Sequence, residues 1–102
     1  MTLSPRNKPD GIHMHFGDLP DHIVFGETVA IDTETQGLNL LRDRLCLLQI
    51  SDGHGQCHLV QFSRNDYSAP NLKKLLADQD ILKIFHFARF DIAIIKQNLD
   101  IL

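Results

Sequence analysis

The chain has 102 residues, with 10 Lys and Arg against 13 Asp and Glu, and a formal net charge of −3 with its histidines neutral. This length suits one small domain, and the 43% content of hydrophobic residues is typical of a folded chain and excludes wholesale disorder. The charge balance excludes a long basic track for nucleic acid, so a polyanionic substrate would have to be short or bound mainly through metal.

The first part of the chain predicts a tail, a short strand and a longer strand. Residues 1–11 are polar and contain two prolines, which predicts a flexible arm ahead of a domain at 12–102. Ile12–Phe16 alternates weakly and predicts an edge strand. Val29–Thr35 predicts a well-defined strand, and residues 36–43 predict a loop.

The middle of the chain predicts a hairpin. Residues 45–50 are apolar on both alternating faces, with Leu45 and Leu47 on one and Cys46, Leu48 and Ile50 on the other. This pattern predicts a central strand that is buried on both sides. A strong turn signal at 52–55 then leads into a strand at 56–62.

The last part predicts a helix from Pro70 to Leu76, a short strand at 81–85 and a helix at about 87–99. With the weak edge strand set aside, the order is β-β-β-α-β-α. An antiparallel start followed by a crossover into a further strand predicts an α/β fold with a mixed sheet.

The most informative motif is the pair Asp32 and Glu34 at the end of the strand that begins near Val29. Residues two apart on a strand share a face, so both carboxylates point to the same side. Two such charges repel unless a cation lies between them, and hard divalent metals such as Mg²⁺ and Mn²⁺ prefer oxygen ligands. The pair therefore suggests a metal site, although on its own such a pair is more often solvated surface.

A second group, from His86 to Asp91, follows a predicted strand and begins a helix. Asp91 in the first turn is favourable for the helix on structural grounds alone, because a helix N-terminus carries partial positive charge. The functional interpretation makes Asp91 a third metal ligand and brings His86 and Arg89 near a phosphate. The alternatives are a hydrogen-bonded core histidine and a solvated surface arginine.

Three blocks of sequence together resemble a known family. They are Val29 to Leu38 (VAIDTETQGL), Arg42 to Ser51 (RDRLCLLQIS) and Lys83 to Asp91 (KIFHFARFD). In this order they resemble the first two exonuclease motifs of the DEDD superfamily of 3′→5′ exonucleases, in the branch of ribonuclease D and nanoRNase C. The resemblance implies an RNase H-like fold that is incomplete at the C-terminus, and hydrolysis of RNA or short oligonucleotides from the 3′ end.

The resemblance also implies roles for individual residues. Asp32, Glu34 and Asp91 would be catalytic and would hold two divalent cations, Mg²⁺ or Mn²⁺, which activate water and stabilise the leaving oxygen. The residues that would contact the 3′ end of the RNA or short oligonucleotide are Thr33, Gln36, Gly37, Leu38, His86, Phe87 and Arg89.

The chain departs from the family at the third motif, a Tyr-x-x-x-Asp that would supply a fourth carboxylate. Tyr67 is followed at the fourth position by Asn71, and it precedes the second motif instead of following it. We therefore interpret the chain as the N-terminal half of a nuclease. The alternative is a catalytically incomplete module for binding or assembly.

The expected partners and location complete the hypothesis. An apolar C-terminal helix predicts a homo-oligomer or a missing C-terminal half that covers it. Cys46 and Cys57 lack the spacing of a zinc site, so free thiols are expected. Without a signal peptide or a long apolar stretch, we expect no membrane partner and a cytoplasmic location.

Overall fold

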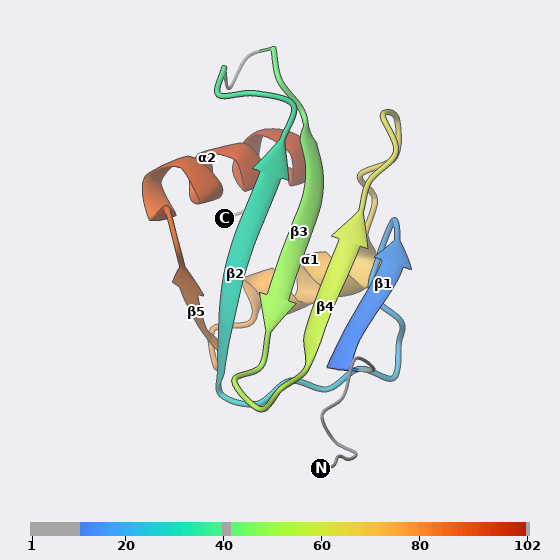
Figure 1. The fold of residues 1–102 in the computed structure, drawn as a ribbon, viewed down its shortest axis with the longest axis vertical. Helices are drawn as coiled ribbons and strands as arrows, with labels where there is room; N and C mark the ends of the chain where they lie inside the picture. Colours follow the sequence, from blue (N-terminus) through green and yellow to red (C-terminus); the bar gives the residue numbers. More distant parts are fainter. Residues whose placement is uncertain (1–10, 40–41, 102) are drawn as a thin grey trace.

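The computed structural model describes residues 11–39 and 42–101. It contains five strands and two helices in the described residues (Figure 1). In chain order they are β1 (Ile12–Phe16), β2 (Thr28–Thr35), β3 (Leu45–Ser51), β4 (Cys57–Gln61), α1 (Pro70–Ala77), β5 (Leu82–Phe85) and α2 (Ala88–Leu99). The predicted arm at 1–11 lies outside the described residues, except for Gly11.

The strands form one mixed sheet in the order β1-β4-β3-β2-β5 (Figure 1). β2, β3 and β4 pair in antiparallel fashion, as the predicted hairpin requires. β5 pairs parallel to β2 after the crossover through α1, and β1 pairs parallel to β4 as an edge strand. The predicted α/β class, mixed sheet and edge strand are therefore confirmed.

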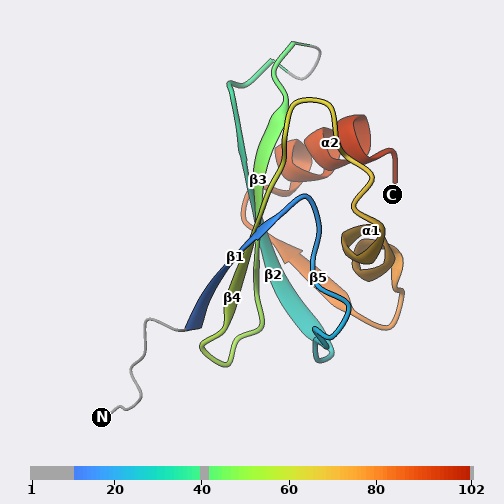
Figure 2. The same cartoon turned by 90° about the vertical axis from the view of Figure 1, so that its right-hand side faces the viewer.

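Both helices pack on the same face of the sheet, and the other face is open (Figure 2). Alternate strand residues and the apolar sides of the helices fill the core between these two layers. The core residues include Val29, Ile31, Leu45, Leu48, Ile50, Val60, Leu72, Leu76, Ile94, Ile95 and Leu99. The open face instead presents large apolar side chains to solvent, namely Ile12, Met14, Phe16, Leu82 and Ile84.

The prediction that β3 is buried on both sides is wrong. β3 is the middle strand, but only Leu45, Leu48 and Ile50 are fully buried. The pairing with β2 shifts by one residue between Glu34 and Thr35, so Leu45 lies on the same face as Leu48 and not on that of Leu47. The other face of β3 is only half-covered, because no helix packs on it.

The helix boundaries follow from local chemistry. Pro70 begins α1 as predicted, at a position where its missing N–H costs nothing. The carboxylate of Asp18 accepts hydrogen bonds from the N–H groups of Asn71 and Leu72, at 2.9 and 2.8 Å. This carboxylate therefore caps α1 from a segment more than fifty residues earlier in the chain.

Two further expectations concern the cysteines and the membrane. Cys46 and Cys57 are free thiols, as predicted, and both are half-buried. Within residues 11–39 and 42–101, no helix combines the length and apolar character that crossing a bilayer requires.

Candidate active site

The alternation of side chains along β2 gives the strand one face in the core and one face that carries the predicted metal ligands. Val29 and Ile31 are fully buried under the helices, whereas Asp32 and Glu34 are exposed. Because strand side chains alternate, Asp32 and Glu34 point to the open face of the sheet together. The prediction that the two carboxylates share a face is confirmed.

The end of β2 has a free edge where these carboxylates lie. β5 pairs with β2 only up to the position where Phe85 lies opposite Ile31. From Asp32 onward, no strand among residues 11–39 and 42–101 pairs with this edge of β2, and α2 begins beyond the end of β5 (Figure 1). The edge therefore gives side chains of β2 and of the first turn of α2 access to one another.

Asp91 occupies this corner and is almost fully buried, with 2% of its surface exposed. One carboxylate oxygen accepts a hydrogen bond of 2.5 Å from the Thr33 hydroxyl, and the other accepts one of 3.0 Å from the N–H of Phe87. Phe87 is the N-cap residue of α2, and its own side chain provides no cap. Asp91 thus fixes the start of α2 and joins it to β2.

The structure brings Thr33 and Asp91 together, but it does not gather the three carboxylates into a ready metal site. Within the described part of the chain, no group of three or more His, Cys, Asp or Glu residues is placed to hold a metal ion. The reason is the alternation of side chains along β2. Asp91 contacts Thr33, whose side chain lies on one face of β2. Asp32 and Glu34 point to the opposite face. A shared metal site stays a prediction.

The chemistry of the donors nevertheless fits a hard divalent cation. Asp32 and Glu34 are exposed oxygen donors on a free strand edge, and Asp32 accepts one hydrogen bond, from the adjacent N–H of Thr33. Each carboxylate oxygen has two lone pairs, so Asp91 can keep both of its hydrogen bonds and still offer a lone pair to a ligand. These three residues would hold the ions.

A cavity of about 350 Å³ on the open face connects two predicted site residues. Asp32 and His86 both line it, together with Ala30, Gln49, Ser51 and Ile84. Sequence reasoning missed Gln49 and Ser51. A signal existed for Gln49, since it is a polar residue inside the apolar run of β3 and lies opposite Asp32 in the sheet.

The loop after β2 holds the next predicted residues. Gln36 is exposed, and Leu38 is 80% exposed although it is apolar. A side chain at Gly37 would collide with Asp43, since a Cβ there would lie 2.3 Å from an Asp43 carboxylate oxygen. A side chain at Gly37 would therefore have to displace the hydrogen-bonded carboxylate of Asp43, which organises the loop.

Asp43 is buried and accepts hydrogen bonds from the guanidinium of Arg42 and from the N–H of Asn39. The bond from Arg42, followed by that from Asn39, holds the pKa of the Asp43 carboxyl below its usual value. The loop that carries Leu38 is thus folded around a charged group.

The remaining predicted residues lie at the start of α2. His86, Phe87 and Arg89 are all exposed, and Phe87 is exposed to 64% although it is aromatic. The Phe87 ring lies 6.4 Å from that of Phe90, between ring centroids. The core-histidine alternative for His86 is not found. The exposure of Arg89 is compatible with both a phosphate contact and the solvated-surface alternative, and both side chains are available to a ligand.

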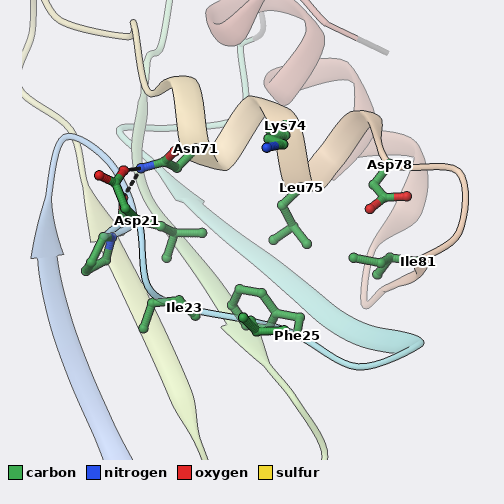
Figure 3. Close-up of a pocket in the computed structure, with 11 residues that line it drawn as sticks. Asp21, Ile23, Phe25, Asn71, Lys74, Leu75, Asp78 and Ile81 are labelled. Carbon is green, nitrogen blue, oxygen red and sulfur yellow. Dashed lines mark hydrogen bonds between the residues drawn. The ribbon is translucent and has the colours of Figure 1, made fainter.

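A second cavity, also of about 350 Å³, lies between the segment 19–25 and α1 (Figure 3). Its walls are mostly apolar, with Leu75, Ile23 and Phe25 pointing into it and Lys74 and Asp78 beside them. None of the predicted site residues lines it. The candidate active site is therefore the free edge of β2 and the adjoining open-face cavity.

The family follows from comparison with known proteins. The sequence pattern that describes a 3′–5′ exonuclease matches residues 19–102, which include both blocks of predicted site residues. The chain belongs to the 3′–5′ exonuclease family. No match was found among curated proteins.

Solved structures place this exonuclease chain near the nanoRNases, as the resemblance implied. Brucella melitensis NrnC bound to pGG shares 49% sequence identity with it, at a TM-score of 0.81 over 87% of this chain. The same protein with bound Mg²⁺ shares 50% identity, at a TM-score of 0.79 over 85% of the chain. A nuclease in its apo form shares 40% identity, at a TM-score of 0.85 over 89% of the chain.

These similarities confirm the predicted RNase H-like fold. The exonuclease chain spans 44% of each of the two NrnC chains and 45% of the apo nuclease. It therefore corresponds to less than half of the length of these relatives.

Proposed function

We propose that this chain carries the first two motifs of a metal-dependent 3′→5′ exonuclease that hydrolyses RNA or short oligonucleotides from the 3′ end. The observation that carries the proposal is the exposed pair Asp32 and Glu34 on the free edge of β2, with Asp91 at the adjacent start of α2. The similarity to NrnC in complexes with pGG and with Mg²⁺ supports both the substrate class and the cofactor.

In this proposal the cations supply charge stabilisation and an activated water, and the residues of the chain position the substrate. The exposed apolar surfaces of Leu38 and Phe87 would contact bases, since a base has an apolar face that prefers such a contact. Arg89 would contact a phosphate of the backbone. His86 and Gln49 would line the substrate side of the Asp32 cavity.

The test uses the chain joined to a segment with the third motif, since the family requires that motif for the fourth carboxylate. We expect Mg²⁺- or Mn²⁺-dependent release of nucleotides from a 5′-labelled short RNA. Asp32→Ala or Glu34→Ala should reduce turnover at least about a hundredfold, because each removes a ligand from ions that contribute several kcal/mol.

Glu27→Gln is the matched control, because Glu27 is an exposed glutamate directly before β2 and outside the site. It should retain normal turnover. Near-native turnover of Asp32→Ala or Glu34→Ala in a protein with an unchanged circular dichroism spectrum would contradict the assignment.

Arg89→Ala should raise KM more than it lowers kcat, because it removes a phosphate contact. Unchanged kinetics would support the interpretation of Arg89 as a solvated surface residue.

The expectation that the apolar side of the C-terminal helix needs a partner is wrong, because Ile95 and Leu99 of α2 are already buried in the core. One other observation, the apolar open face, favours the alternative of a non-catalytic binding or assembly module. Phe16 and Leu82 on this face are exposed to 76% and 63%, which is unusual for a surface that faces only water. We propose that this face is covered by further chain or by a second copy. Light scattering that shows a monomer, together with a single sharp thermal unfolding transition of the 102-residue chain, would contradict this part of the proposal.

The proposal has three further parts. The enzyme would also use Mn²⁺, it would be related to ribonuclease D, and it would be located in the cytoplasm. The half-buried free thiols Cys46 and Cys57 agree with a reducing compartment. Activity measured with Mn²⁺ in place of Mg²⁺, and fractionation of cells that express the tagged protein, test the first and last of these points.

A further inference from the structure

Three histidines meet where β1 pairs with β4, at the sheet edge farthest from β5. His13 lies directly opposite His58 in the parallel register, and His15 lies two pairs further along, opposite Val60. The ring of His58 stacks on that of His13 at 4.8 Å and on that of His15 at 5.2 Å, between centroids. We call these three residues the histidine cluster.

His58 is enclosed on the side of the sheet that faces the core, whereas His13 and His15 are half-buried. His58 is 7% exposed, and the ring of Phe25 meets its ring edge-on at 5.5 Å. His13 is anchored through its Nε2, which lies 2.7 Å from Oε1 of Gln56. Little room is left for water to solvate a charge on His58.

Hydrogen bonding limits how many protons the cluster can hold. Nε2 of His15 lies 3.0 Å from Nδ1 of His58, so one nitrogen must donate and the other must accept. A neutral imidazole has one donor and one acceptor, but an imidazolium has two donors. One of the two rings can therefore be charged while the bond persists, but charging both leaves two N–H groups facing each other.

Burial and the neighbouring histidines both favour the neutral forms of His15 and His58. Burial, followed by the proximity of His13 and His22, lowers the pKa of His15. Burial, followed by His13 and His15, likewise lowers the pKa of His58, and Asp52 in the β3–β4 turn acts in the opposite direction. A base whose pKa is lowered by folding stabilises the fold fully above its unfolded pKa of about 6.5, and this stability declines as the pH falls below that value.

Apart from the cluster, β1 is held by its backbone ladder to β4 and by the hydrogen bond that the Gly17 N–H donates to the Gln61 carbonyl at 2.8 Å. Its other face carries Ile12, Met14 and Phe16, which are exposed to 63%, 48% and 76% and have no covering layer. The segment after β1 is tied down separately, because Asp18 caps α1 through the N–H groups of Asn71 and Leu72. Loss of the cluster would therefore leave β1 held by its edge ladder alone, while the residues that follow it stay anchored.

We propose that the bonded pair His15 and His58, packed against the ring of His13, forms an acid-sensitive latch, in which neutral His15 and His58 rings hold β1 on β4 and uptake of protons by this pair releases β1. Release would expose the outer edge of β4, whose unpaired N–H and C=O groups can accept another strand. The latch is a conformational switch at the edge opposite to the candidate active site, and it does not depend on the proposed activity.

The test is amide hydrogen exchange by NMR on the full chain at about pH 7.5 and about pH 5, on either side of the ordinary histidine pKa. After correction for intrinsic exchange, opening of β1 should increase about tenfold per pH unit for each proton taken up. The amides of Asn71 and Leu72 should keep their protection. Equal protection of β1 at both pH values would overturn the latch, and so would a loss that Asn71 and Leu72 share.

Variants separate the cluster from other histidines. His58→Phe keeps a stacked ring without a titrating nitrogen, so β1 should stay protected at about pH 5. If this variant does not fold, His15→Asn serves instead, since it removes one titrating ring from the bonded pair. His54→Gln is the control, because His54 lies exposed in the β3–β4 turn, and it should keep the acid-induced opening of the unaltered chain.

Discussion

Asp91 and Asp32 are the same chemical group on neighbouring elements, yet their surroundings differ. Asp91 is 2% exposed, and its two oxygens accept hydrogen bonds from Thr33 and Phe87. Asp32 is exposed on the open face, and the bond that it accepts comes from the adjacent N–H. Of the carboxylates predicted to bind metal, one also supports the fold, and Asp32 and Glu34 are free to serve a ligand.

Other aspartates belong to the supporting class. Asp18 caps α1 from the segment after β1, and Asp43 organises the loop after β2. Asp18 accepts N–H groups of the first turn of α1, which have no partner within the helix. The distinction predicts that supporting carboxylates control stability, whereas Asp32 and Glu34 affect activity and leave stability unchanged.

The largest expected effect on stability is that of Asp91→Ala. It leaves the Phe87 N–H and the Thr33 hydroxyl without their acceptor in a buried corner, which should cost about 1–3 kcal/mol of unfolding free energy. Urea unfolding measures this loss. Asp32→Ala is the matched control and should change the unfolding free energy by less than about 0.5 kcal/mol. Equal losses in the two variants would break the distinction.

A smaller effect is expected for Asp18→Ala, which removes the acceptor for two N–H groups at the start of α1. The loss should be about 1 kcal/mol, as for other helix caps. Thermal and urea unfolding measure it, and Asp80→Ala, in the exposed turn after α1, is the control. An unchanged midpoint for Asp18→Ala would show that α1 is held by its apolar side alone.

The smallest effect concerns Asp43 and depends on pH. Its pKa is lowered by Arg42 and by the N–H of Asn39. A carboxyl with a lowered pKa stabilises the fold above its unfolded pKa of about 3.9, and this stability is lost as the pH falls through the lower, folded value. Asp43→Asn should therefore be less stable at neutral pH, with a deficit that shrinks on acidification. A loss of unfolding free energy that does not change with pH would show that the charge of Asp43 contributes nothing and that the residue supports the loop by its shape alone.

Much of the site could be predicted from sequence because its signals are local. The spacing of Asp32 and Glu34 on a strand determines that they share a face, whatever packs around them. The position of Asp91 in the first turn of a helix was likewise local, and both its structural and its functional interpretation remain in force. Gln49 was missed, although its place in an apolar strand was a usable signal.

The contacts between distant residues could not be predicted in this way. The hydrogen bond of Thr33 to Asp91 joins residues 58 positions apart, and it depends on where β5 ends beside β2. The histidine cluster exists because β1 pairs parallel to β4, which places His13 opposite His58. Neither pairing follows from the local pattern, because alternation determines the direction of side chains but not the choice of neighbouring strand.

By itself, then, the sequence determined the strands and helices, the α/β class, the shared face of Asp32 and Glu34, and the family through three blocks of residues. The tertiary structure alone decided which faces are covered. Both helices pack on one side of the sheet, and the register shift between Glu34 and Thr35 turns Leu45 to that side. Only one face of β3 is therefore fully buried. The physical reason is that burial of apolar surface is non-directional, so an apolar strand specifies that it must be covered but not by which element.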